Sequence, residues 1–215
     1  MNLIYYIILL SILFFTLFLI HKSYNKAPKK IKVLLIASLT LFSLRSITLL
    51  LMCVIKDAYF IYYLKYFINL NYLYVPILIS ILYYVNFRFD NMSFNTNYII
   101  ALIITAFYLL TITLNKAIVR VDLQFGYIME LSNSKLVSIL MIVLLGAFLL
   151  TGLLLIDKKN SKKWNIILII AITFIFIIES LAITIKIWIF PYVVVSELLL
   201  IFIINKSLNT FKAIK

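Results

Sequence analysis

The stretch that decides the fold is "WNIILIIAITFIFIIESLAITI", Trp164 to Ile185. It holds one ionisable side chain, Glu179, and a helix needs only about 20 apolar residues to cross the hydrocarbon core of a bilayer. We therefore predict a membrane-spanning helix here. A carboxylate at membrane depth is costly and usually has a partner or a function. Glu179 thus raises the question of what neutralises it.

The composition of the whole chain extends this interpretation. Of its 215 residues 66% are hydrophobic and only 13% are charged, whereas soluble domains are about half apolar and a quarter charged. We predict an all-α integral membrane protein, with residues 1–215 forming a single polytopic domain in the lipid bilayer. The net charge of +13 does not indicate a nucleic-acid partner, because the basic residues lie in short clusters between apolar runs.

Seven apolar runs are long enough, or nearly so, to cross the membrane. They are Asn2–Ile20, Val33–Val54, Ala58–Val85, Tyr98–Leu114, Leu136–Ile156, Trp164–Ile185 and Ile187–Ile204. Only Lys186 separates the last two runs, so a tight turn is expected there. Pro191 suits either that turn or the first turn of the last helix.

The distribution of Lys and Arg predicts the orientation. Thirteen of them flank the runs on one side and five on the other, and the richer side is expected to be cytoplasmic. The N-terminus is then outside, a short tail of about residues 205–215 is inside, and the longest external loop is about residues 115–135. The Lys- and Ile-rich composition is typical of an AT-rich bacterial genome, so we expect a multi-pass protein of the bacterial plasma membrane.

The external loop contains "VRVDLQF", Val119 to Phe125, which alternates apolar and polar residues and is followed by Gly126. This period of two predicts a short strand or hairpin on the outer surface. An ordinary ordered loop remains the alternative. If the segment is a strand, Val119, Val121, Leu123 and Phe125 share the face that rests on the helices.

Four ionisable residues lie within the predicted spans: Arg45, Lys65, Glu179 and Glu197. With a rise of about 1.5 Å per residue, Arg45 and Glu197 lie about 14–15 Å below the outer surface of the core, and Lys65 and Glu179 about 9 Å. Each depth thus holds one cation and one anion. Because unpaired charges in lipid are costly, we predict the pairs Lys65–Glu179 and Arg45–Glu197, with exchanged partners as the alternative.

Polar side chains accompany Lys65 in the third span. Asn69 and Tyr72 follow Lys65 at helical spacing and are expected to share its face, and Pro76 is a candidate kink below them. With the charges, these residues are candidates for a polar, ligand-binding cavity open to the outside. The alternative is a set of interhelical ion pairs that only fixes the packing.

Residues for catalysis do not come together in this sequence. The only histidine, His21, and the only cysteine, Cys53, are predicted at opposite faces of the membrane, no Asp lies inside a span, and no Gly-rich phosphate loop is present. We therefore expect neither an enzyme nor a cofactor or metal site.

Three features carry a resemblance to a known family: "YFINLNYLYVPILISILYYVNF", Tyr66 to Phe87; "LLTITLN", Leu109 to Asn115; and Pro191 at the start of the last span. They resemble the N-terminal seven-helix membrane region of some bacterial sensor histidine kinases. The chain departs from that family because no kinase or other output domain follows within it. The resemblance implies seven helices and a sensing role. Arg45 and Glu197 match no motif of that family.

These observations favour a receptor-like, sensory membrane protein that reads an external or membrane-dissolved signal, an unknown small ligand, and passes it to a separate signalling partner. A small transporter or permease subunit is the second hypothesis, and an immunity or accessory membrane protein the third. Transporters are expected to show inverted repeats and broken helices, and neither is visible in the sequence, which favours the receptor.

Overall fold

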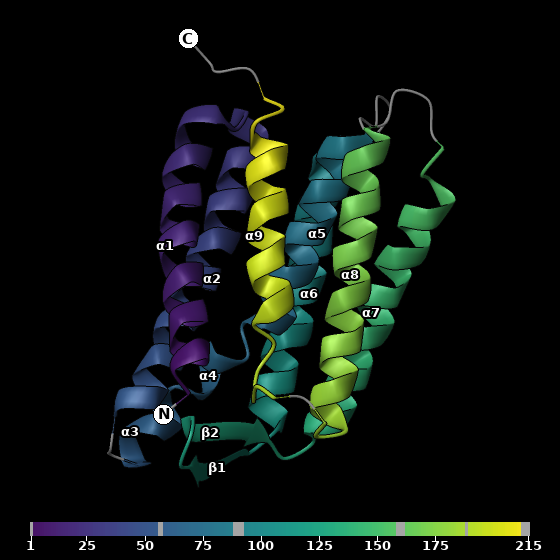
Figure 1. The fold of residues 1–215 in the computed structure, drawn as a ribbon. Helices are drawn as coiled ribbons and strands as arrows, with labels where there is room; N and C mark the ends of the chain where they lie inside the picture. Colours follow the sequence, from purple (N-terminus) through teal and green to yellow (C-terminus); the bar gives the residue numbers. More distant parts are fainter. Residues whose placement is uncertain (1, 56–57, 88–92, 158–161, 188, 212–215) are drawn as a thin grey trace.

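Long helices dominate the computed structural model, which describes residues 2–55, 58–87, 93–157, 162–187 and 189–211 (Figure 1). Six helical segments of this part are long and apolar enough to cross a membrane. They are α1 (Leu3–Lys26), α2 (Lys29–Val54), the pair α4 and α5 (Lys65–Ile68 and Asn71–Phe87), α6 (Asn95–Leu114), α7 (Ser134–Leu154) and α8 (Lys163–Thr184). The prediction of an all-α membrane protein is thereby confirmed as far as helix length and apolar composition show it.

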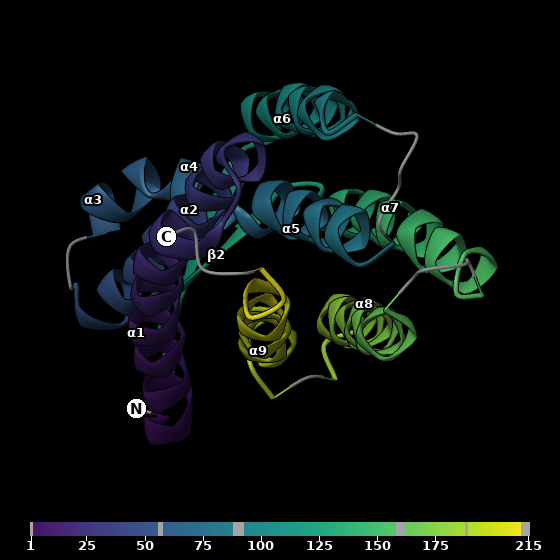
Figure 2. The same cartoon turned by 90° about the horizontal axis from the view of Figure 1, so that it is seen from above.

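The centre of the bundle is α5. It packs against α2, α6, α7, α8 and the last helix, α9 (Val195–Leu208), and Figure 2 shows it inside the ring formed by these helices. In the segment formed by α4 and α5, 83% of the residues of the apolar window are buried, against 22% for α7. The outer helices instead present Leu, Ile and Phe side chains outward, as expected of surfaces in contact with lipid.

The third predicted span is not one helix. It consists of α3 (Ala58–Tyr63), α4 and α5, with turns at Leu64 and at Asn69–Leu70. At the second turn the amide of Tyr72 bonds the carbonyl of Asn69, so the carbonyl of Ile68 is left without its usual partner four residues on. Pro76 is accommodated within α5. The predicted face that joins Lys65 to Tyr72 is wrong, because the helix is interrupted between them.

The last helix begins later than predicted. Lys186, with φ of +64°, ends α8 in a Schellman motif, in which its amide bonds the carbonyl of Ile183 and that of Ile187 bonds Ala182. Residues 189–194 are not helical, and α9 starts at Val195 instead of Ile187. Its 14 residues are about 21 Å long, less than the roughly 30 Å core.

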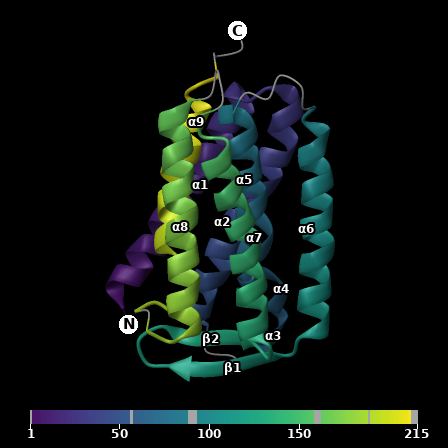
Figure 3. The same cartoon turned by 90° about the vertical axis from the view of Figure 1, so that its right-hand side faces the viewer.

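The predicted external loop forms a β-hairpin of β1 (Ala117–Asp122) and β2 (Gly126–Leu131), which pair antiparallel with Asp122 opposite Gly126. Figure 3 shows the hairpin lying across the helix ends at which the N-terminus also lies. The strand alternative is thus confirmed, but the predicted inward face is wrong in part: Val121 is 71% and Leu123 is 96% exposed.

The exposure of Leu123 has a simple reason, a turn that ends β1 at Asp122. The carboxylate of Asp122 accepts hydrogen bonds from the amides of Gln124 and Phe125, at 2.7 and 3.1 Å, which places Leu123 at the tip. The second strand faces the helices, with Met129 and Leu131 buried.

The opposite end of the bundle holds the turn between α1 and α2 and the end of α9 (Figure 1). Of the predicted cytoplasmic tail, about 205–215, the first residues continue α9 as far as Leu208. Residues 212–215 lie outside the described residues.

Candidate functional site

A buried ion pair joins α2 to α9. Nη1 of Arg45 lies 2.5 and 2.6 Å from the two carboxylate oxygens of Glu197, and both side chains are 1% exposed. The hydroxyl of Tyr74 in α5 also donates to Glu197. The predicted Arg45–Glu197 pair is therefore present, and it links three helices in the middle of the bundle.

Two irregular stretches of backbone supply the remaining acceptors for Arg45. Its Nε donates to the unpaired carbonyl of Ile68 at 2.8 Å, and Nη1 approaches the carbonyl of Val193 at 3.4 Å. Backbone without helical hydrogen bonds is tolerated at membrane depth only where other groups satisfy it. Arg45 thus satisfies the break between α4 and α5 as well as the segment that precedes α9.

Glu179 caps a helix instead of pairing with a cation. Its carboxylate oxygens accept hydrogen bonds from the amides of Val194, Val195 and Ser196, at 3.0, 3.1 and 2.9 Å, and from the hydroxyl of Ser196. These amides belong to the first turn of α9, whose positive end favours a carboxylate. The predicted Lys65–Glu179 pair is wrong, because α8 lies against the start of α9 and supplies the cap.

Lys65 lies elsewhere. Its Nζ is 5.9 Å from the centre of the Tyr66 ring, and it does not line the cavity described below. It lies at the start of the short helix α4, beyond the break that separates it from Asn69 and Tyr72. Lys65 is therefore not part of the cavity that the other predicted residues line.

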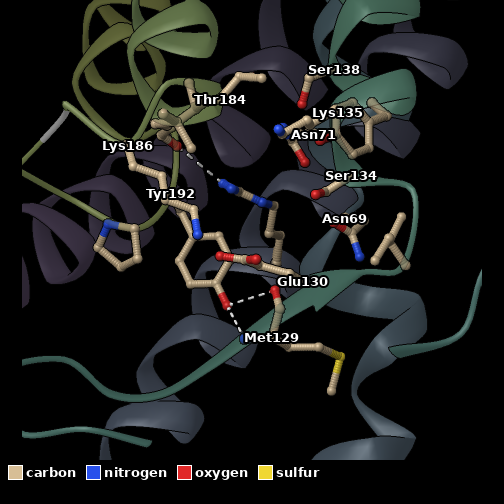
Figure 4. Close-up of a pocket in the computed structure, with 16 residues that line it drawn as sticks. Asn69, Asn71, Met129, Glu130, Ser134, Lys135, Ser138, Thr184, Lys186 and Tyr192 are labelled. Carbon is tan, nitrogen blue, oxygen red and sulfur yellow. Dashed lines mark hydrogen bonds between the residues drawn. The ribbon is translucent and has the colours of Figure 1, made fainter. Parts of the chain in front are cut away.

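A cavity of about 110 Å³ lies under the hairpin (Figure 4). Arg45 lines it. The sequence-predicted Asn69 and Tyr72 also line it. Figure 4 shows Thr184, Lys186 and Tyr192 entering from one side and Asn71, Ser134 and Ser138 from the other, with Glu130 of β2 beneath. The structure thus brings Arg45, Asn69 and Tyr72 together with polar residues from α7, α8 and the hairpin.

The charge around this cavity is positive. Lys135 and Lys186 are exposed at its edge, and neither has an ion-pair partner in the part of the chain that the structure describes. Glu130 is paired with Arg120 on the neighbouring strand. The arrangement suits a small ligand that carries a negative charge.

Tyr192 fastens the hairpin to the segment before α9. Its hydroxyl accepts a hydrogen bond from the amide of Met129 at 2.8 Å and donates one to the carbonyl of the same residue at 3.2 Å. The next two residues reach the other groups of the site, since Val193 contacts Arg45 and Val194 donates to Glu179. One short stretch of chain therefore connects the hairpin, which covers the cavity as a lid, to the ion pair and the helix cap.

No protein-family model, curated protein or solved structure matches this chain. The resemblance to histidine kinase sensor regions therefore remains a prediction.

Sequence reasoning missed Lys135 and Lys186, which it treated as loop residues, and Tyr192, which it placed within the last predicted span. Their roles depend on the fold: Lys186 lines the cavity because α8 ends in a left-handed residue, and Tyr192 because the last helix starts late. Reasoning from the sequence also missed both interrupted segments. Within the described residues no cluster of His, Cys, Asp and Glu is arranged to hold a metal ion.

Proposed function

We propose that the chain is a receptor-like, sensory membrane protein of the bacterial plasma membrane. It reads an external or membrane-dissolved ligand in the cavity under the hairpin. It passes the signal through α9 to a separate partner at the cytoplasmic face. The polypeptide crosses the membrane seven times, with its N-terminus outside.

The observation that carries this proposal is the connection from the lid to α9. Tyr192 holds β2, Val193 contacts Arg45, and the next amides are capped by Glu179. From there α9 runs to the opposite end of the bundle, packed between α1 and α8 (Figure 1). A ligand that moves the hairpin therefore acts directly on the first turn of a helix that ends at the far side.

The seventh crossing is supported by the same stretch. The 14 residues of α9 are too short to span the core alone, and the non-helical residues 189–194 extend it toward the hairpin end. Non-helical backbone is compatible with membrane depth here because Arg45 and Glu179 satisfy its polar groups. The orientation follows from the thirteen-to-five distribution of basic residues.

The variant Tyr192→Phe tests the connection, because it removes both bonds to Met129 and retains the ring. We expect faster amide exchange in the hairpin and also along α9 as far as Leu208, measured by mass spectrometry in nanodiscs. The matched control is Tyr98→Phe, which removes one hydroxyl bond, 2.9 Å long, to Lys30 at the other end of the bundle. An effect of Tyr192→Phe that stays within the hairpin contradicts signalling through α9.

Transport is the second candidate, and the structure adds an observation in its favour. The breaks between α4 and α5 and between α8 and α9 meet at Arg45, as interrupted helices do at transporter binding sites. The structure thus contains the broken helices that are not visible in the sequence. We still favour sensing, because the residues that line the cavity all come from the hairpin half of the bundle.

Proteoliposomes separate the two functions. Under an applied gradient we expect the reconstituted protein to release acetate, phosphate and glutamate no faster than empty vesicles do. The variant Glu197→Gln, which disturbs the central pair, serves as the comparison. Sustained flux that depends on Glu197 would replace the sensory proposal with transport.

A further inference from the structure

An apolar groove runs between α6 and α7 on the lipid-facing side of the bundle. These two helices pack against α5 and hardly touch each other, and Figure 2 shows α6 above α5 and α7 beside its right-hand end. The groove encloses about 350 Å³ and is lined by Ile103 and Phe107 of α6 and by Leu140, Leu144 and Ala147 of α7. It is thus an open apolar slot at membrane depth.

The groove and the polar cavity under the hairpin share a wall. Tyr72 lines both, and Ser138 of α7 lines the cavity next to it. The first turns of α7 supply Ser134, Lys135 and Ser138 to the cavity, and the following turns supply the groove. Between Ser134 and Ala147 the helix rises about 20 Å. A single extended ligand along α7 would therefore meet a polar site first and an apolar slot next.

The sizes and charges of the two sites are complementary. The cavity, at about 110 Å³, is smaller than the roughly 300 Å³ at which small-molecule sites begin, whereas the groove reaches that size. The edge of the cavity carries Lys135 and Lys186 without ion-pair partners among the described residues. A compact anionic group fits the cavity, and an alkyl chain fits the groove.

We propose that the ligand is an anionic amphiphile whose head lies among Arg45, Lys135 and Lys186 under the hairpin and whose alkyl chain lies in the groove between α6 and α7. This inference deepens the proposed function and rests on it for what binding achieves. The ligand enters sideways from the membrane, so that its alkyl chain reaches the groove without passing the hairpin. The site itself is tested by binding alone.

The binding test uses a sixteen-carbon carboxylate with a diazirine on its chain, photolysed with the protein in nanodiscs and mapped by mass spectrometry. We expect adducts concentrated on the residues of α6 and α7 that line the groove. Unlabelled palmitate should compete, whereas hexadecanol, which lacks the charge, and acetate, which lacks the chain, should not.

Two variants separate head from chain. Lys135→Gln with Lys186→Gln removes the charges, and we expect about a tenfold loss of labelling, because each lysine contributes attraction to an anionic head. Lys206→Gln, at the far end of α9, is the control. Ala147→Phe fills the groove and should abolish labelling, whereas Ala171→Phe on the exposed face of α8 should not.

Several results would overturn the inference. In the labelling experiment they are adducts spread evenly over all lipid-facing helices, equal competition by hexadecanol, or protection by acetate alone. In the variant experiment the contradicting result is a parent protein without groove labelling whose oligomeric state changes when Ala147 is replaced by Phe. The last result would assign the groove to a second copy of the chain. Specific labelling without any response of amide exchange in α9 would retain the site and contradict the sensory function, so the two failures are distinguishable.

Discussion

Arg45 is the residue on which the irregular parts of this bundle depend. It is 1% exposed, it pairs with Glu197, and its Nε donates a hydrogen bond to the carbonyl of Ile68. A buried ion pair stabilises a protein only when its remaining hydrogen-bonding groups are satisfied. Here Tyr74 and the backbone satisfy them, so removal of one charge leaves the other exposed to an apolar interior.

A double-mutant cycle tests this pair. Arg45→Met and Glu197→Gln should each lower the free energy of unfolding by about 3–5 kcal/mol, because each leaves a buried charge unpaired. The double variant should lose less than the sum of the two, by more than about 1 kcal/mol. Unfolding is measured in bicelles by titration with dodecyl sulfate.

The control cycle is Lys65→Met with Glu179→Gln, which also joins one basic and one acidic residue of the predicted spans. Glu179 bonds the amides before α9 and Lys65 lies over Tyr66, so these two effects should add within about 0.5 kcal/mol. Additive effects of Arg45 and Glu197, or strong coupling of Lys65 and Glu179, would contradict the structure.

At the scale of elements, close packing of α7 depends on one glycine. A methyl group at Gly152 would overlap the hydroxyl of Tyr83 in α5 and approach Cγ1 of Ile170 in α8 to 2.8 Å. A methyl group at Gly146, in the same helix, would meet nothing within 4 Å. The two glycines therefore provide a matched pair in which only the neighbourhood differs.

We expect Gly152→Ala to lower the free energy of unfolding by about 1–3 kcal/mol, since the neighbours must move apart. Gly146→Ala should be neutral or stabilising by up to about 1 kcal/mol, because alanine favours a helix. Both are measured by the same titration in bicelles. Equal effects of the two substitutions would mean that α5, α7 and α8 do not meet at Gly152.

Another element, the hairpin, is held to the bundle by a glycine for a different reason. Gly126 has φ of +79°, and a methyl group there would lie 2.8 Å from the carbonyl oxygen of Met52 in α2. The start of β2 therefore lies directly on the end of α2. Aromatic contacts of Tyr5 with Phe125 and Phe190 hold the same end of the hairpin. These contacts anchor the turn end of the hairpin to the helices next to it.

For the whole molecule, the orientation in the membrane decides which end meets the ligand. The hairpin lies at one end and the last turn of α9 at the other (Figure 3). Leu123 at the hairpin tip is 96% exposed, and Asn209 after α9 is exposed as well. Both positions are suitable for chemical labelling.

In a Cys53→Ser background, cysteine in place of Leu123 should react with an impermeant maleimide in intact cells, whereas cysteine in place of Asn209 should react only after permeabilisation. The reason is the excess of basic residues on the side of Asn209. A permeant maleimide that labels both is the control. The reverse pattern would place the hairpin in the cytoplasm and remove the basis for an external ligand. Ser161, in the loop before α8, is also expected on the cytoplasmic side, but it lies outside the described residues.

The sequence by itself determined the helical membrane fold and one buried ion pair, that of Arg45 with Glu197. Runs of about 20 apolar residues are sufficient to predict helices in lipid, because no other open structure satisfies the backbone there. Opposite charges at similar positions in their predicted spans were also sufficient to predict the pair of Arg45 with Glu197. The depth count behind that prediction holds for Arg45, which lies in a regular helix, but not for Glu197, because α9 begins only at Val195.

Tertiary structure alone decided the partner of Glu179, the breaks around Arg45 and the cavity under the hairpin. Glu179 had a cation at matching depth in the sequence, yet the start of α9 lies closer, and residue number does not give depth once a helix is interrupted. The cavity is built by Asn71, Lys135, Lys186 and Tyr192, which come from four separate segments. Only the packing of those segments, and the left-handed turn at Lys186, brings them together.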